Sequence, residues 1–291
     1  MDETSADNEF EDGDSKWDEA DVLQITKCSD LTLRLQSIEN GIADKFDGKV
    51  LLIENIEEFY VPEFLAGAPF TDFKSFSTIA FRNLTFKQIP SYLEFKDRAE
   101  VVFYNISLSE DFPSIFEIRI TNEEQDIDPV FRMEKCTFQD VAGLDQLGGN
   151  PLKIFWKNNH KDGDRCNFDY KGHCILLNND FGYLNNKNIL IEGGDVVDIY
   201  NNSMHVMNEM AIELWNVKKA NFEGNYFGVA VNTPAVFFEY DERVASGCDR
   251  DDLSESDVNN TFKNNVSFSV HSLKLFNGFQ IPFLLDVCNV L

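Results

Sequence analysis

A short pattern of two apolar residues separated by one residue recurs along the chain at nearly regular intervals. Measured at the second apolar residue, these intervals are 22, 30, 38, 23, 23 and 40 residues. A period of about 22–23 residues, lengthened in places by insertions, predicts a solenoid whose neighbouring repeats complete each other's core. The recurring positions are Phe86, Leu108, Phe138, Leu176, Ile199, Phe222 and Phe262.

A second column of apolar residues runs in step with the first. Its members follow Leu176, Ile199, Phe222 and Phe262 by 15, 15, 15 and 13 residues, and each lies in a strand-like segment. A repeat of about 23 residues has room for three short strands joined by turns. The pattern therefore predicts an all-β stack of parallel strands. The second column consists of Ile191, Leu214, Phe237 and Leu275.

Asparagine marks the turns of the later repeats, in the segments LNNDF, YNNSM, EGNYF and KNNVS. Together with the period, these turns resemble the right-handed parallel β-helix of the pectin-lyase-like superfamily, over roughly residues 45–285 and at the level of the fold. The resemblance implies that stacked turn asparagines, here Asn179, Asn202, Asn225 and Asn265, bond to one another along the stack. This fold hosts lyases, hydrolases, adhesins and structural proteins, so it does not fix the activity.

The expected organisation is one β-helix domain behind an acidic tail. Residues 1–27 hold many carboxylates and few cations, which predicts a disordered, solvating segment. Residues 28–291 form the domain, with an N-terminal cap at 28–44 and repeats over about 45–285. Long insertions at 121–130, 142–173 and 240–258 are expected to be surface loops, where function often lies.

The charge narrows the set of partners. The chain carries 51 acidic and 25 basic residues, a net charge of −26, which disfavours nucleic acids and anionic lipid surfaces. No segment approaches the roughly 18 apolar residues of a membrane span, and no apolar signal-peptide core follows Met1. We expect an extracellular protein whose signal peptide has been removed; a cytosolic protein is the alternative.

Six cysteines favour the extracellular interpretation. In the first column, Cys136 and Cys174 stand two residues before Phe138 and Leu176, which predicts neighbouring inward positions within reach of a disulfide. Pairing of Cys174 with Cys166, or free buried thiols, are the alternatives. The disulfide candidates are Cys28, Cys136, Cys166, Cys174, Cys248 and Cys288.

Five asparagines begin an Asn-x-Ser/Thr triplet, the acceptor sequence for N-glycosylation. A strand that alternates asparagine, apolar and hydroxyl residues also creates such triplets without any glycan. Both interpretations are open at this point. The candidates are Asn83, Asn105, Asn201, Asn259 and Asn265.

Outward positions beside the first column contain the candidate catalytic group. Asp198 and Glu223 are predicted diagonal neighbours on adjacent repeats, with His205 and Lys218 within one repeat of them. The polysaccharide-degrading members of the resembled superfamily use carboxylates and basic residues in such positions, so these four side chains are candidates for acid–base catalysis. A solvated polar face is the alternative.

A row of outward aromatic residues is the candidate binding surface. Trp215, Phe238 and Phe276 follow the second column by one residue and are predicted to form an exposed stripe that packs against sugar rings. Coverage by another segment, or contact with a second subunit in a homo-oligomer, would equally explain the stripe. The histidines show no metal-ligand spacing, and no cofactor or metal site is predicted beyond weak Ca²⁺ binding by the acidic insertion.

The sequence thus predicts a secreted, non-catalytic structural or binding protein of an extracellular matrix or surface, in contact with a polysaccharide or another matrix component. A polysaccharide lyase or glycoside hydrolase acting on an outward face of the β-helix is the alternative function. The repeat period predicts the fold, and the residues that determine the function are expected on the outward faces and in the insertions.

Overall fold

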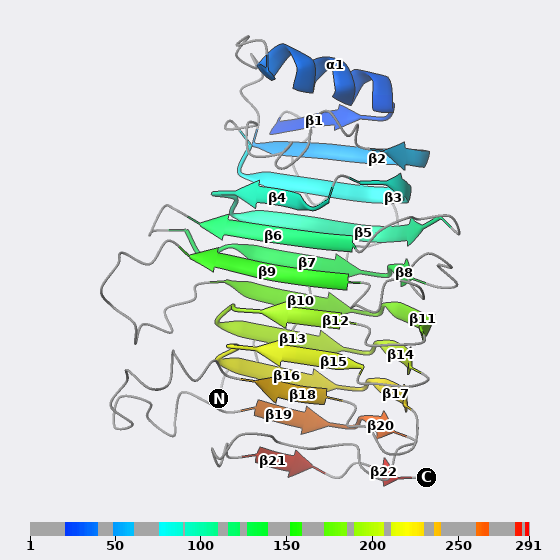
Figure 1. Ribbon diagram of the computed structural model, residues 1–291, viewed down its shortest axis with the longest axis vertical. Helices are drawn as coiled ribbons and strands as arrows, with labels where there is room; N and C mark the ends of the chain where they lie inside the picture. The colour runs from blue at the N-terminus through cyan, green and yellow to red at the C-terminus, as the bar shows by residue number, and fades with distance from the viewer. Residues whose placement is uncertain are drawn as a thin grey trace.

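The computed structural model of this protein stacks parallel strands at successive levels, with one helix at the N-terminal end (Figure 1). It describes residues 21–39, 49–60, 76–89, 91–109, 116–122, 127–138, 152–158, 172–184, 189–206, 211–229, 236–239, 260–267, 283–286 and 289–290. Residues 1–20 of the expected acidic tail and all of the expected insertion 240–258 lie outside these ranges. Two expectations were wrong: residues 22–25 of the expected disordered tail 1–27 form a paired strand, and residues 152–158 of the expected surface loop 142–173 form a strand with buried side chains.

The strands belong to two sheets, and all the strand pairs are parallel. The smaller sheet B has six strands: β4 (Leu93–Lys96), β6 (Phe116–Asn122), β9 (Leu152–Asn158), β12 (Ile189–Glu192), β15 (Ile212–Trp215) and β18 (Val236–Glu239). The larger sheet A has 16 strands. They are β1 (Val22–Ile25), β2 (Val50–Tyr60), β3 (Thr78–Gln88), β5 (Glu100–Leu108), β7 (Val130–Glu134), β8 (Thr137–Phe138), β10 (His173–Leu177), β11 (Asp180–Leu184), β13 (Val196–Tyr200), β14 (Ser203–Val206), β16 (Lys219–Glu223), β17 (Tyr226–Val229), β19 (Asn260–Lys263), β20 (Val266–Ser267), β21 (Phe283–Asp286) and β22 (Asn289–Val290).

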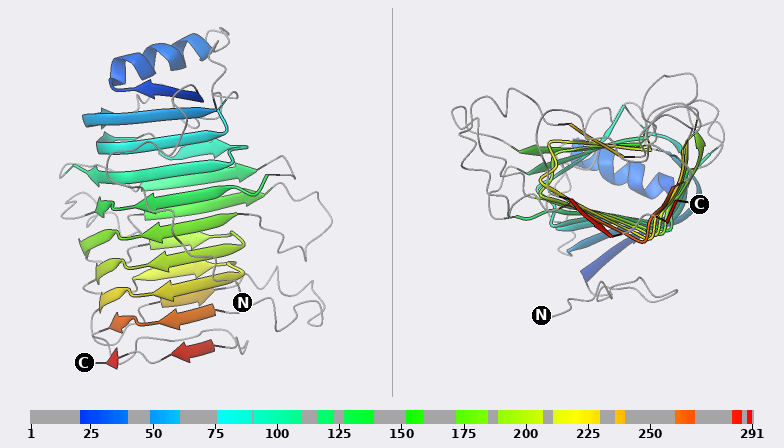
Figure 2. Two further views of the ribbon diagram at one scale, coloured as in Figure 1. Left: turned by 180° about the vertical axis from the view of Figure 1, so that it is seen from behind. Right: turned by 90° about the horizontal axis from the view of Figure 1, so that it is seen from below.

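Sheet A has two arms that meet at a corner. One arm runs β7–β10–β13–β16–β19–β21, the other runs β8–β11–β14–β17–β20–β22, and the long strand β5 pairs with both arms. Each pass of the chain, called a rung below, follows one arm, turns at the corner, follows the other arm and then crosses to sheet B. Seen along the stack, the strands of successive rungs superpose (Figure 2, right).

Helix α1 (Cys28–Glu39) lies beyond β1 at one end of the stack (Figure 1). This helix occupies most of the segment that was expected to form the N-terminal cap. Leu31 of α1 is buried against the core of the first rungs. No helix within the described ranges is long and apolar enough to cross a membrane.

The corner of each rung requires a left-handed backbone. The residue at this position has a φ between 52° and 59° at Asn55, Asn83, Asn105, Lys135, Asn178, Asn201 and Asn264, and 67° at Gly224. Asparagine and glycine tolerate this conformation better than other residues. The asparagines at the corners therefore favour the left-handed backbone. The sequence pattern did not distinguish them from the asparagines that directly follow them in the later rungs.

The residue after the corner points inward and changes character halfway along the stack. It is apolar in the first rungs, at Ile56, Leu84 and Ile106, and asparagine in the later ones. Each of the later asparagines donates from Nδ2 to Oδ1 of the next, over 2.9, 3.1 and 2.9 Å. This buried ladder consists of Asn179, Asn202, Asn225 and Asn265.

The residues of the first predicted column belong to two different columns in the structure, one before and one after the corner. Leu176, Ile199, Phe222 and Phe262 are in register before the corner, where Met133 precedes Leu176. Phe138 lies beyond the corner instead, in register with Phe181, and Phe86 and Leu108 pair there too. The prediction was wrong at this step because each rung has an apolar pair on both sides of its corner, and an insertion of varying length hides which pair continues the column.

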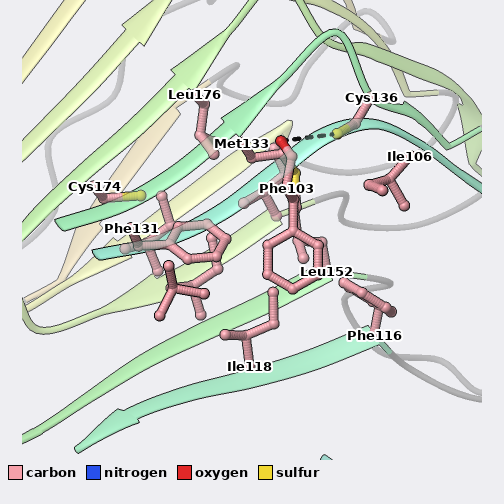
Figure 3. Close-up of a cluster of buried hydrophobic side chains, with 14 of the residues drawn as sticks. Phe103, Ile106, Phe116, Ile118, Phe131, Met133, Cys136, Leu152, Cys174 and Leu176 are labelled. Atoms are coloured by element: carbon pink, nitrogen blue, oxygen red, sulfur yellow. Dashed lines mark hydrogen bonds between the residues drawn. The ribbon is translucent and has the colours of Figure 1, made fainter. Parts of the chain in front are cut away.

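Phenylalanine rings fill much of the interior. Phe81 and Phe103 stack with their centroids 4.8 Å apart, and Phe222 and Phe262 do so at 4.6 Å. Stacked and edge-on rings of this kind stabilise a core beyond the area that they bury. Figure 3 shows the cluster around Phe103, which includes side chains from both sheets.

The predicted pairing of Cys136 with Cys174 is wrong. Cys174 is in register with Phe131 and Val197, whereas Cys136 lies next to the corner, where its thiol approaches the carbonyl of Phe103 (Figure 3). The error has the same cause as the joined column. Cys28, Cys136 and Cys174 carry free thiols, and Cys166, Cys248 and Cys288 lie outside the described residues.

Candidate functional site

The outer face of the first arm of sheet A carries a hydrogen-bonded row of polar side chains. Asp198 on β13 accepts a bond of 2.7 Å from Nδ2 of Asn221 on β16, and Oγ1 of Thr261 on β19 donates to Asn221 over 2.8 Å. These three residues are directly in register on consecutive strands, and alternation along each strand points them away from the core. The row therefore follows from the same register that builds the core.

A histidine and a tyrosine complete this group. Nε2 of His173 on β10 lies 2.7 Å from Oδ2 of Asp198, and the hydroxyl of Tyr200 also bonds to Asp198. His173, Asp198, Tyr200, Asn221 and Thr261 are called the polar row below. The side chain of Asp198 is 14% exposed and that of His173 is 35% exposed, so the row lies at the surface without being freely solvated.

The polar row favours the ionised form of Asp198. Partial burial raises the pKa of this carboxyl, but hydrogen bonds from His173 and Asn221, the charge of His173 and the bond from Tyr200 outweigh burial, so the pKa falls below its ordinary value. Burial and the nearby charges of Asp198 and Glu223 raise the pKa of Tyr200. The row thus presents a carboxylate beside a neutral phenol.

The four predicted catalytic residues do not form one group. Glu223 is exposed and, as expected, is diagonal to Asp198, since Tyr200 and not Asp198 is its partner in register. Lys218 instead forms an ion pair with Asp195 at 3.1 Å. His205 lies beyond the corner on β14, where it approaches Ser203 and the ring of Tyr226. The corner separates it from the outer face of the first arm.

Of the five residues of the polar row, only Asp198 was a candidate predicted from the sequence. His173 reaches Asp198 diagonally from the preceding rung, because His173 itself is in register with Val196. Tyr200 follows Asp198 by two residues and so shares its face. His173 stands three residues before Leu176 and Tyr200 one residue after Ile199, but the predicted acid–base group was centred on the two carboxylates and took His205 as its histidine.

The predicted aromatic stripe is also wrong. Phe238, and not Phe237, is in register with Leu214, so Phe238 points inward, is 2% exposed and packs edge-on against Phe222 and Phe262. Trp215 is partly exposed on sheet B, in register with Glu192 and Glu239. A shift of one residue transfers a strand's side chains to the opposite face, which accounts for the error. Phe276 lies outside the described residues.

The candidate glycosylation sites occupy different environments. Asn83, Asn105 and Asn201 are exposed at left-handed corners, where Nδ2 of Asn105 donates to Asn83 and Nδ2 of Asn83 donates to Asn55. Asn265 is 4% exposed and its Nδ2 donates to the backbone carbonyl of Phe222 over 2.9 Å, so a glycan at this asparagine is incompatible with the fold. Asn259 lies outside the described residues.

No group of three or more histidine, cysteine, aspartate or glutamate side chains in the described part of the chain is arranged to hold a metal ion. The acidic insertion that we considered for weak Ca²⁺ binding lies outside that part. Comparison of the chain with protein-family models, curated proteins and solved structures finds no match. The site has therefore to be interpreted from its own chemistry.

Proposed function

We propose that this protein is a secreted, non-catalytic binding protein of an extracellular matrix or surface, and that its polar row contacts a hydroxyl-rich carbohydrate. The observation that carries the proposal is the close grouping of a carboxylate, an amide, an imidazole and a phenol on one outer face. Such groups exchange hydrogen bonds with sugar hydroxyls, and an aromatic ring among them offers a face to the sugar.

We propose a right-handed parallel β-helix of the pectin-lyase-like type as the scaffold. The parallel pairing of the strands and the ladder of buried asparagines support this assignment. Such a scaffold repeats outward positions at the strand spacing of about 4.8 Å, so it suits an extended ligand with a repeating structure. A net charge of −26 favours a neutral polysaccharide over a polyanionic one.

The state of Asp198 favours binding over catalysis. A general acid or base works best when its pKa lies near the working pH, whereas the hydrogen bonds around Asp198 lower its pKa. Its two oxygens already accept bonds from His173 and Asn221. A carboxylate offers about four lone-pair positions, so Asp198 retains the capacity to accept bonds from ligand hydroxyls.

A glycan array of neutral polysaccharides, probed with the full chain, tests this proposal. We expect the protein to bind a glycan without releasing new reducing ends. Tyr200→Ala should lower the affinity at least about tenfold. Trp215→Ala, a control on sheet B, should retain the wild-type affinity. Tyr200→Phe separates the contribution of the ring from that of the hydroxyl. Turnover that disappears in Asp198→Asn would instead favour the lyase or hydrolase alternative. Binding that is unaffected by Tyr200→Ala, or no binding to any neutral glycan, would overturn the proposed site.

A further inference from the structure

Apolar side chains also line the outer face of sheet A in its first rungs. Leu52, Ala80 and Val102 are in register on β2, β3 and β5, and their neighbours in sequence point into the core. They form a cluster separate from the core, together with Tyr104 and the partly buried Val22 of β1. This group is called the outer cluster below.

The outer cluster is buried although it faces away from the interior. Leu52, Ala80 and Val102 are 3%, 1% and 1% exposed, and Tyr104 is 7% exposed. The alternation of a β-strand would leave one of its two faces to solvent in a single-layered sheet. Both faces of β2, β3 and β5 are buried here, so a further segment has to cover the outer one.

Charged residues surround the outer cluster. Arg82 pairs with Glu54, Arg132 pairs with Glu134 at 2.9 Å, and Nζ of Lys135 donates to the hydroxyl of Tyr104 over 2.8 Å. Glu54 and Glu134 are 1% and 0% exposed, which is rare for charged residues on an open face. Glu100 stands on the same outer face, two residues before Val102, so three cations and three carboxylates line this region.

We propose that the acidic N-terminal segment, residues 1–20, docks on the outer cluster as an intramolecular ligand. The described chain begins at Asp21, and the next residue, Val22, already belongs to the cluster, so this segment is tethered at its edge. The segment combines two aromatic residues, Phe10 and Trp17, with a single cation and many carboxylates. The carboxylates are Asp2, Glu3, Asp7, Glu9, Glu11, Asp12, Asp14, Asp18 and Glu19.

The length and the apolar residues of the segment fit this occupant. A segment of 20 residues can extend over roughly 65 Å, whereas the strand intervals that separate β2 from β7 add up to only about 15 Å. The aromatic rings match the apolar side chains of the outer cluster. Arg82 and Arg132 already pair with Glu54 and Glu134, whereas Nζ of Lys135 bonds to the neutral hydroxyl of Tyr104, so Lys135 is the cation at this edge that a carboxylate of the segment would approach. The same outer column continues from Val102 through Arg132 and Ile175 to Asp198, so the docked segment would lie next to the polar row.

Carbodiimide cross-linking of the full chain, followed by peptide mass spectrometry, tests the docking. This reagent joins a lysine to a carboxylate in direct contact. We expect cross-links from the segment 1–20 to Lys135 in preference to Lys153, the control on the outer face of sheet B. An equal mixture of isotope-labelled and unlabelled protein distinguishes links within one chain from links between two chains.

Footprinting by hydroxyl radicals gives a second measurement. We expect oxidation of Tyr104 to rise several-fold in the double variant Phe10→Ser and Trp17→Ser, while oxidation of Tyr226 on β17 stays unchanged. Equal cross-linking of Lys135 and Lys153, links only between chains, links from Lys135 to residues 61–75, or an unchanged Tyr104 footprint would each overturn the proposal. These outcomes are independent of glycan binding, so failure here leaves the proposed function untouched.

Discussion

Cys136 and Asn179 occupy the same position on successive rungs, and Oδ1 of Asn179 accepts a hydrogen bond of 2.8 Å from the backbone nitrogen of Cys136. The residues directly after the corners form an inward-facing column along the stack, and this contact joins its apolar half to its asparagine half. Ile106 precedes Cys136 on the apolar side, and Asn202 follows Asn179 on the polar side. The small cysteine therefore lies where packing by apolar side chains changes to hydrogen bonding by amides.

Replacing Asn202 by leucine should destabilise the protein strongly. Asn202 is 1% exposed; its Nδ2 donates to the carbonyls of Leu176 and Tyr200, and its Oδ1 accepts from the backbone nitrogen of Asn179. Leucine preserves the size but leaves these buried groups without partners, which costs about 3 kcal/mol or more in the free energy of unfolding. Urea denaturation measures this cost.

Asn201→Gly is the matched control for Asn202→Leu. Asn201 is the exposed left-handed residue of the same corner, with a φ of 54° that glycine adopts readily. We expect a change of less than about 1 kcal/mol in the free energy of unfolding. A similar loss in both variants would show that the corner backbone, and not the amide ladder, stabilises these rungs.

Two glycines near Trp156 should respond differently to alanine. Gly194 has a φ of 98°, and an added Cβ would lie 3.6 Å from its nearest neighbour, so Gly194→Ala should cost only the left-handed strain of about 1–2 kcal/mol. Gly172 has a φ of 142°, and its Cβ would overlap the indole of Trp156. Gly172→Ala should therefore cost roughly 1–3 kcal/mol more than Gly194→Ala. Equal denaturation midpoints for the two variants would contradict this contact.

The core residues between 176 and 222 could be predicted because the spacing between them is constant. Leu176, Ile199 and Phe222 follow one another at 23 residues and are in register in the structure. Met133 and Phe138 stand on opposite sides of one corner and both fit the same apolar pattern. Only backbone geometry, here the left-handed φ of 54° at Lys135, shows which of them continues the column.

The candidate site was accessible from the sequence only in part. The outward direction of Asp198 follows from the position of Ile199, and the diagonal relation to Glu223 follows from the same register. The contact of His173 with Asp198 depends on how far an imidazole reaches across the space between two strands. Burial on the outer face, as at Leu52 and Val102, depends on what covers a sheet, and the register of a strand does not contain that information.

Cys136 and Cys174 should resist alkylation in the native protein. Burial raises the pKa of the Cys136 thiol to about 12 and raises that of Cys174 well above its usual range, and the thiolate is the reactive form. With iodoacetamide at pH 8 and no reductant, mass spectrometry should find both residues unmodified before unfolding and modified after it. A disulfide-linked peptide that contains both residues would contradict the strand register that keeps the two thiols apart.

Asp198→Asn should destabilise the protein at neutral pH and lose this effect in acid. The pKa of Asp198 in the folded protein lies below its ordinary value of 3.8, because the bonds from His173, Asn221 and Tyr200 outweigh burial. The unfolded chain therefore binds the proton more readily, and the contribution of the carboxylate to stability is complete above pH 3.8 and declines as the pH falls through the folded pKa. Urea midpoints of the wild type and Asp198→Asn should converge as the pH falls below 3.8, whereas Glu223→Gln, which changes an exposed neighbour, should have little effect at any pH. A difference between wild type and Asp198→Asn that stays constant over this range would show that the carboxylate is not held by the polar row.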